Sequence, residues 1–168
     1  GRETEIETLL KSFQRVSEGA AEMMLVAGYS GVGKTALVRE VHKPMTEKQG
    51  YFAAGKFDQF QRNIPYFAIS QAFNEFCSYL LTESTVQLNQ WREKILKAVG
   101  KNGQVLIDII PQLELVIGAQ PAVAQVGPTE AQNRFNWFFQ NFFRAICQKE
   151  HPLVLFIDDL QWADSASL

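Results

Sequence analysis

An eight-residue segment, from Gly28 to Thr35, contains the residues of this chain that are best suited to bind an anion. It reads GYSGVGKT and fits the pattern G-x-x-x-x-G-K-[ST], with Gly28, Gly33, Lys34 and Thr35 at the defining positions. Glycine allows backbone conformations that a Cβ forbids, so successive N–H groups can face phosphate oxygens. Lys34 can reach the terminal phosphates, and the Thr35 hydroxyl can bind Mg²⁺. The segment therefore predicts a phosphate-binding loop, or Walker A motif, for a nucleoside triphosphate.

The whole loop is expected to contact the nucleotide, mainly through its backbone. The residues assigned to this contact are Gly28, Ser30, Gly31, Val32, Gly33, Lys34 and Thr35. A chance match in a glycine-rich turn is the alternative. The apolar run 23–27 before the loop and the helical pattern after it favour the functional interpretation, because a phosphate loop joins a strand to a helix.

Two acidic residues follow a second apolar run, in the segment LVLFIDDLQWAD. A strand that ends in aspartate delivers a carboxylate to the carboxyl edge of the sheet, where open α/β sheets bind ligands. Asp158 is the candidate Mg²⁺ ligand of a Walker B motif. Asp159 is the candidate residue that orients or deprotonates the water attacking the γ-phosphate. Taken alone, such a pair is more often a helix cap or part of a solvated turn, and the loop at 28–35 reverses that preference.

Hydrophobic periodicity indicates the elements that must position these residues. Apolar positions recur at helical spacing over 3–17, and 23–27 is predicted as a buried strand. The next helix starts at Lys34 and runs to about 48, with Pro44 kinking it or ending it early. Strands are predicted at 51–57 and 153–157, the latter buried on both faces. Further helices are predicted at 66–82, 86–98, 103–110 and 129–149, and an ordered linker or surface loop at 111–128.

The aromatic helix 66–82 is predicted to pack in the core and not to bind a cofactor. Phe67, Phe73, Phe76 and Leu80 recur at near-helical spacing, which packing alone explains. The two cysteines, Cys77 and Cys147, are expected to be buried reduced thiols, because no C-x-x-C spacing indicates a zinc site or a redox pair.

Composition limits the classes of function. The chain has 168 residues, 46% of them hydrophobic, and a formal net charge of −2, which suits one globular domain. This charge argues against a nucleic-acid partner, which would need a basic face. No apolar run approaches the length of a membrane span, and the start of the sequence lacks the order of a signal peptide, so a cytoplasmic setting is expected.

Several motifs together resemble a known family. GRETEI, GYSGVGKT and LVLFIDDLQWAD resemble the signal-transduction NTPases with numerous domains (STAND), near the AAA+ and origin-recognition-like ATPases. GKFDQFQRNIPY, EAQNRF and HPLVLFIDDLQWADSASL look closer still to the ATPase module of large sensor kinases. In those kinases a serine/threonine-kinase-like domain precedes the module, and sensor and histidine-kinase domains follow it. The resemblance covers essentially the whole chain.

The resemblance implies a three-layer α/β P-loop NTPase fold with a mostly parallel sheet in the order 5-1-4-3-2. Residues 1–168 would be the N-terminal part of one such domain, truncated after the Walker B strand, with strands 4 and 5 missing. The long interval between the two motifs implies a helical insert at about 66–127. Sensor residues and any arginine finger would lie beyond Leu168.

The resemblance also assigns site residues and ligands. Arg2 and Glu3 belong to a GRE element near the adenine and ribose, although a solvated helix start explains them equally well. Trp162 and Asp164 match the family signature. ATP and Mg²⁺ are the implied ligands. The implied partners are neighbouring kinase and sensor domains of the same polypeptide, and a nucleotide-dependent oligomer is left open.

These observations favour an Mg-ATP switch module with slow hydrolysis, which is not expected to be active as this fragment alone. One alternative is a scaffold that holds nucleotide without turnover. The other is a DNA-loading initiator-type ATPase, against which the charge balance argues.

Overall fold

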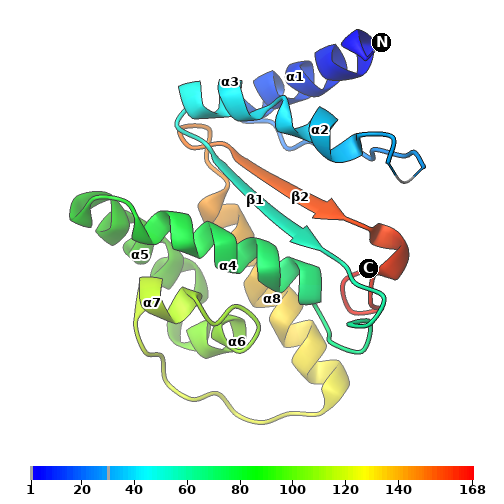
Figure 1. Cartoon of the computed structure of the whole chain (residues 1–168). Helices are drawn as coiled ribbons and strands as arrows, with labels where there is room; N and C mark the ends of the chain where they lie inside the picture. The colour runs from blue at the N-terminus through cyan, green and yellow to red at the C-terminus, as the bar shows by residue number, and fades with distance from the viewer. Residues whose placement is uncertain (1, 30) are drawn as a thin grey trace. The chain divides into compact units, whose positions relative to one another are not determined.

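The computed structural model describes residues 2–29 and 31–168, which form a mixed α/β fold with a small parallel sheet (Figure 1). The helices are α1 (Glu3–Ser17), α2 (Lys34–Arg39), α3 (His42–Glu47), α4 (Phe67–Leu81), α5 (Thr85–Val99), α6 (Gly103–Ile107), α7 (Leu113–Ile117) and α8 (Pro128–Ile146). The strands are β1 (Tyr51–Lys56) and β2 (Leu153–Asp158), and the short 3-10 helices are η1 (Gly100–Asn102) and η2 (Leu160–Trp162).

The chain divides into two compact units. The first unit contains the described residues up to Phe52 together with Cys147–Val154. The second contains Ala53–Ile146 and Leu155–Leu168.

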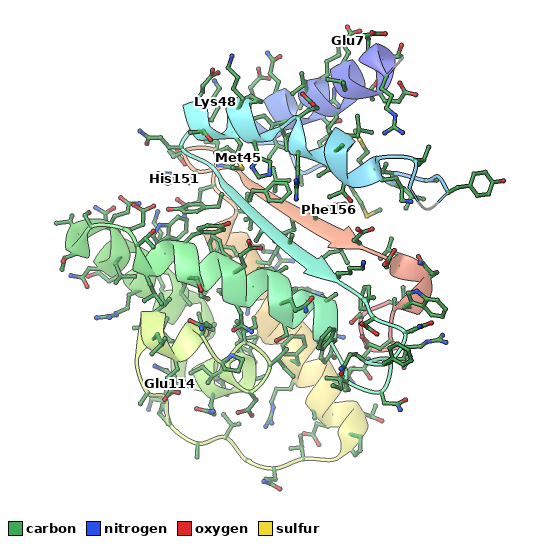
Figure 2. All side chains as sticks on the ribbon, in the orientation of Figure 1. Glu7, Met45, Lys48, Glu114, His151 and Phe156 are labelled. Atoms are coloured by element: carbon green, nitrogen blue, oxygen red, sulfur yellow. The ribbon has the colours of Figure 1, made fainter. Side chains whose placement is uncertain are left out.

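The core of the first unit forms around α1, whose bounds are those predicted from the sequence. Phe13, Val41 and Met45 are buried and form one cluster, and Leu9, Leu10, Phe52 and Val154 pack against them (Figure 2, where Met45 is labelled). Gly19 follows the helix with φ of +105°, a conformation that favours glycine and suits a helix end.

The helix predicted from Lys34 to about 48 is divided into α2 and α3. The break falls at Glu40 and Val41, and Pro44 lies in the first turn of α3. A proline has no N–H to donate to the carbonyl four residues earlier, and its ring clashes with that carbonyl. For Pro44 that carbonyl belongs to Glu40, so a continuous helix cannot pass through this point.

The strand predicted at 23–27 is wrong. These residues carry no regular secondary structure, and Met23 and Leu25 are 98% and 76% exposed. A strand requires hydrogen bonds to a neighbouring strand, and within the described residues the sheet consists of β1 and β2. An apolar run alone therefore does not form a strand here.

The two strands of the sheet pair in a parallel register. Tyr51 N donates to Pro152 O at 2.9 Å, and Phe57 N donates to Asp158 O at 3.1 Å. The constant offset between the paired residues defines a parallel pair and places Lys56 and Asp158 at the same end of the sheet. The predicted strand 153–157 is confirmed, but it is half-buried along its length and not buried on both faces as expected.

Helix α4 covers the edge of β1 that does not pair with β2. Ala54 N donates to Glu75 Oε2 at 2.6 Å, and Lys56 N donates to Gln71 Oε1 at 2.9 Å. Between these two amides, Gly55 lies so close to α4 that a Cβ would overlap the Ala68 carbonyl oxygen. The helix therefore satisfies backbone donors of the strand that would otherwise remain unpaired.

Aromatic residues of α4 pack in the core of the second unit, as predicted. Phe73, Phe76 and Leu80 are buried, whereas Phe67 is half-buried. The ring of Phe73 meets that of Phe142 on α8 at 5.6 Å between centroids, and Phe76 meets Trp91 on α5 at 6.1 Å. Such edge-on ring pairs stabilise the packing beyond the burial of apolar surface.

The loop predicted at 111–128 contains a helix. Leu113, Val116 and Ile117 of α7 are buried, and residues 118–127 are irregular. Two side chains tie this segment to its neighbours: Asn74 Oδ1 accepts from Gln112 N at 3.0 Å, and Arg92 Nε donates to Val116 O at 2.7 Å. The prolines and glycines around α7 concealed a short apolar helix.

The two cysteines differ in environment. Cys77 is fully buried, and burial raises the pKa of its thiol to about 12. Cys147 is exposed, which corrects the expectation that both thiols are buried, because α8 ends at Ile146 and leaves Cys147 outside the helix. Among the described residues, no helix is long and apolar enough to cross a membrane.

Candidate functional site

The glycine loop adopts the backbone conformations for which its glycines were predicted. Gly31 and Gly33 have φ of +78° and +86°, in the left-handed region that residues with a Cβ rarely adopt. Gly28 has an ordinary φ, but a Cβ there would lie 2.8 Å from Val32 Cγ1. At each of these three positions a side chain would strain the backbone or clash with a neighbour, which explains why glycine occurs there. Ser30, also assigned to the loop, lies outside the described residues.

Lys34 begins α2, and its side chain turns back over the loop. Its Nζ donates to Gly28 O at 2.8 Å and to Tyr29 O at 3.1 Å. The ammonium group is thus held by carbonyls of the same loop whose amides were predicted to face phosphate. Such ion–dipole contacts are exchangeable, because a phosphate oxygen is a stronger partner for an ammonium group than a carbonyl.

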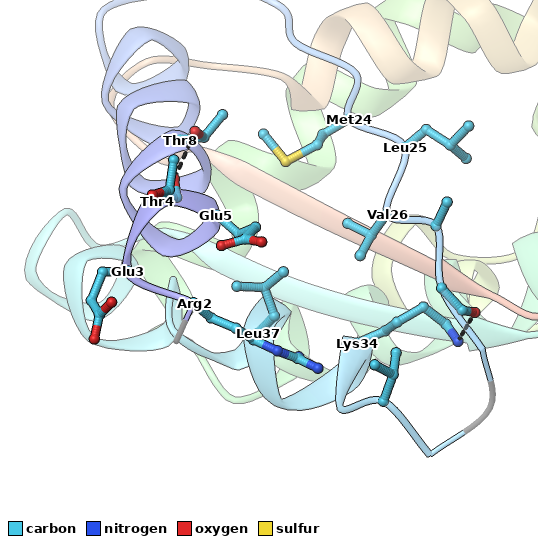
Figure 3. A pocket seen from close by; sticks show the side chains of 13 residues that line it. Arg2, Glu3, Thr4, Glu5, Thr8, Met24, Leu25, Val26, Lys34 and Leu37 are labelled. Atoms are coloured by element: carbon cyan, nitrogen blue, oxygen red, sulfur yellow. Dashed lines mark hydrogen bonds between the residues drawn. The ribbon is translucent and has the colours of Figure 1, made fainter.

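Arg2 contacts the loop from the start of α1. Its Nη1 donates to Gly33 O at 2.8 Å, and the same carbonyl accepts from Leu37 N at 3.1 Å (Figure 3 shows the side chain lying beneath Leu37). A Cβ on Gly33 would lie 3.0 Å from Arg2 Nη1. Arg2 therefore fixes the orientation of the peptide that leads into Lys34.

A pocket of about 820 Å³ lies between α1 and the loop in the first unit (Figure 3). It brings together five of the predicted site residues, and its lining consists of Arg2, Glu3, Thr4, Glu5, Thr8, Met24, Leu25, Val26, Ala27, Gly28, Val32, Lys34 and Leu37. Gly31 and Thr35 are exposed and lie outside this lining. The pocket combines apolar walls with a cationic loop, as nucleotide sites do.

The predicted aspartates lie in the second unit, at the end of β2. Asp158 is the last residue of the strand, and its Oδ1 accepts from Asp159 N at 2.9 Å. Asp159 has φ of +55° and ψ of +46°, a left-handed conformation that is uncommon for a residue with a side chain. Its Oδ2 lies 3.2 Å from Lys56 Nζ, and its Oδ1 accepts from Gln161 Nε2 at 3.3 Å.

The two further signature residues have structural contacts. Asp164 is 6% exposed and accepts from Ser167 Oγ at 2.6 Å and from the Ala166 and Ser167 amides at 3.0 Å. The Arg62 guanidinium lies 5.5 Å from the centre of the Trp162 ring, a cation–π contact. The contact of Arg62 with Trp162 links the segment after β1 to the segment after β2, whereas the contacts of Asp164 lie within the latter.

Lys56 and Arg62 were not assigned a role from the sequence. Both lie in GKFDQFQRNIPY, which carried the resemblance to sensor kinases. The position of Lys56 at the end of a predicted strand was the available signal, because parallel strands deliver their last residues to one edge of the sheet.

Comparison with known proteins identifies the family. A profile for the AAA ATPase domain matches residues 1–168, so the chain belongs to the AAA ATPase domain family, whose members in general use a nucleotide and a metal ion. No solved structure matches the chain significantly.

The curated relatives are histidine kinases. The chain is 38% identical over 166 residues to hybrid signal transduction histidine kinase G of Dictyostelium discoideum. It is 20% identical over 167 residues to histidine protein kinase 1 of Candida albicans and 28% identical over 107 residues to the peroxide stress-activated histidine kinase mak3 of Schizosaccharomyces pombe. These matches cover 99%, 90% and 62% of this chain, but only 5%, 7% and 4% of the relatives. An AAA-type module within a signal-transduction kinase is the setting that these matches support.

Proposed function

We propose that this module binds Mg-ATP, hydrolyses it slowly and acts as a switch for kinase and sensor domains of the same polypeptide. The observation that carries the proposal is the loop 28–35. Its glycines at 31 and 33 are left-handed, and its lysine lies over the loop beside a pocket of about 820 Å³. A loop of this form presents amides and a positive charge to an anion.

The residue types and backbone of the loop support binding of a triphosphate. Among the described residues, the Lys34 ammonium group donates to two carbonyls of the loop. It can exchange these carbonyls for phosphate oxygens. In the proposed site the loop amides and Lys34 bind the phosphates, and the two motifs assign Mg²⁺ to Thr35 of the first unit and Asp158 of the second. Arg2 and Glu3 line the pocket that would receive the nucleoside. The bound nucleotide supplies the phosphoryl group that is transferred to water.

Asp159 is proposed to orient the attacking water. Phosphoryl transfer to water depends on positioning and charge more than on covalent chemistry, so a correctly placed carboxylate is sufficient for this role. The assignment comes from the motif and the family, and the left-handed backbone at Asp159 supports it, because strained backbone tends to occur at functional positions.

The binding half of the proposal is tested with Lys34→Ala in the full-length protein. We expect loss of Mg-ATP binding, measured by titration with a fluorescent ATP analogue, because the loop loses its only side-chain cation. Lys48→Ala is the matched control, since Lys48 is an exposed lysine at the end of α3 in the same unit. Equal affinity of wild type and Lys34→Ala would contradict the proposed site.

The hydrolysis half is tested with Asp159→Asn. We expect unchanged binding and slower phosphate release, by about a hundredfold, the scale of a lost general base. Turnover equal to that of wild type would remove Asp159 from the mechanism. Binding without any phosphate release by the wild-type protein would favour a nucleotide-holding scaffold.

A further inference from the structure

The end of β1 carries a cation that pairs with the proposed water-orienting residue. Lys56 Nζ lies 3.2 Å from Asp159 Oδ2, with 66% and 30% of the two side chains exposed. Both residues belong to the second unit. An exposed pair of this kind adds little to stability, because solvent screens it and two long side chains lose freedom. Its placement therefore calls for an explanation other than stability.

The backbone of each partner is held in place independently of the ion pair. Lys56 N donates to Gln71 Oε1 at 2.9 Å, which ties the strand end to α4. Phe57 N donates to Asp158 O at 3.1 Å, which keeps the two strand ends level. Asp159 directly follows β2 and has a left-handed backbone, with φ of +55° and ψ of +46°. The ion pair therefore joins two side chains whose backbones are already held by other contacts.

The two oxygens of Asp159 are held unequally. Oδ2 faces the ammonium group of Lys56, whereas Oδ1 accepts from Gln161 Nε2 at 3.3 Å, which is long for a hydrogen bond. The charged contact is the stronger of the two. Oδ1 is therefore the oxygen that can change partner while the carboxylate keeps its orientation.

We infer that Lys56 is a positioning residue for the reaction, holding Asp159 by Oδ2 so that Oδ1 can accept a hydrogen bond from the attacking water. This inference rests on the proposed function. The reaction needs no strong base, because the transition state of phosphoryl transfer is loose and the attacking water must chiefly be oriented. A carboxylate held by an ammonium group suits that requirement.

The test measures steady-state hydrolysis and Mg-ATP affinity for the full-length protein. Lys56→Ala is expected to lower kcat about tenfold while the dissociation constant of Mg-ATP stays unchanged, because orientation is lost and binding is not. Lys56→Arg keeps the charge and is expected to remain within about threefold of wild type. Lys11→Ala is the matched control, since Lys11 forms an exposed ion pair with Glu7 at 2.6 Å on α1.

A double mutant separates positioning from a general structural effect. If Lys56 acts through Asp159, Lys56→Ala in the Asp159→Asn background lowers kcat no further than Asp159→Asn alone. A merely structural role would instead lower the melting temperature of Lys56→Ala and multiply the two losses.

Two results would overturn the inference alone. They are wild-type kcat for Lys56→Ala and multiplicative losses in the double mutant. Failure of the wild-type protein to bind Mg-ATP, or binding without any hydrolysis, would instead refute the proposed function and, with it, the basis of the inference. Measuring binding and hydrolysis of the wild-type protein first therefore distinguishes the two failures.

Discussion

The close approach of α4 to β1 makes Gly55→Ala the most informative change in the fold. A methyl group on Gly55 would overlap the carbonyl oxygen of Ala68 and lie 2.8 Å from its carbonyl carbon and 3.2 Å from its Cα. All three atoms are backbone, so no side-chain rotation relieves the clash. Strand and helix must separate, and Ala54 and Lys56 would then lose hydrogen bonds to Glu75 and Gln71.

The expected cost follows from that geometry. Overpacking typically destabilises by 1–3 kcal/mol, and a clash against rigid backbone belongs at the upper end, about 3 kcal/mol. A glycine-to-alanine change at an unstrained position stabilises by about 0.4–1 kcal/mol, so the sign is opposite to that general rule. For a chain of this size the melting temperature should fall by roughly 6–12 °C.

Thermal unfolding followed by circular dichroism measures the effect. Gly127→Ala is the matched control, because a Cβ on Gly127 meets no atom within 4 Å and its φ is not positive. We expect the control to melt at the wild-type temperature or up to about 4 °C above it. If Gly55→Ala also melts within that range, the tight contact between α4 and β1 does not exist and the account of the sheet edge is wrong.

Two further predictions concern buried groups of the second unit. Burial raises the pKa of Cys77 from 9.0 to about 12, so above pH 9 the unfolded chain loses this proton while the folded chain keeps it. The free energy of unfolding should then fall by up to about 1.4 kcal/mol per pH unit between pH 9 and 12, and urea titrations should show a shallower fall in Cys77→Ala; equal slopes would contradict the buried thiol. The Tyr66 hydroxyl is buried and has no hydrogen-bond partner among the described residues, so Tyr66→Phe should be neutral or stabilise by about 1 kcal/mol in urea unfolding. The matched control Tyr79→Phe removes a hydrogen bond to Glu75 and should destabilise by about 1 kcal/mol, and the reverse order of the two variants would refute this assignment.

Elements that local pattern determines were predictable from the sequence. The helix 3–17 was predicted with its observed bounds, because its apolar stripe, its acidic first turn and Gly19 all lie within the segment. The break near Pro44 was also expected, since a proline cannot donate a hydrogen bond to the carbonyl four residues earlier, which is a local effect. The prediction of a strand at 23–27 was wrong, because strand pairing depends on a neighbouring strand that no local sequence pattern reveals.

In the candidate site too, features that depend on local sequence were predictable and contacts between distant residues were not. The left-handed glycines followed from the motif, which encodes backbone geometry directly. The contact of Arg2 with Gly33 spans 31 residues, and the pair of Lys56 with Asp159 joins the ends of two strands, so neither appears in a local pattern. The exposure of Cys147 likewise depends on where α8 ends, and helix ends are the least predictable feature of a sequence.

Because of the side chains of Gln71 and Glu75, a further strand can join the sheet beside β2 but not beside β1. They occupy the amides of Lys56 and Ala54, so an incoming strand finds no free donors at either residue on that rim. Along β2, alternate residues turn their N–H and C=O groups away from β1, and this is the side on which a further strand can pair. A helix that uses two polar side chains in place of a strand thus protects one side of the molecule from joining a second copy by edge-to-edge association.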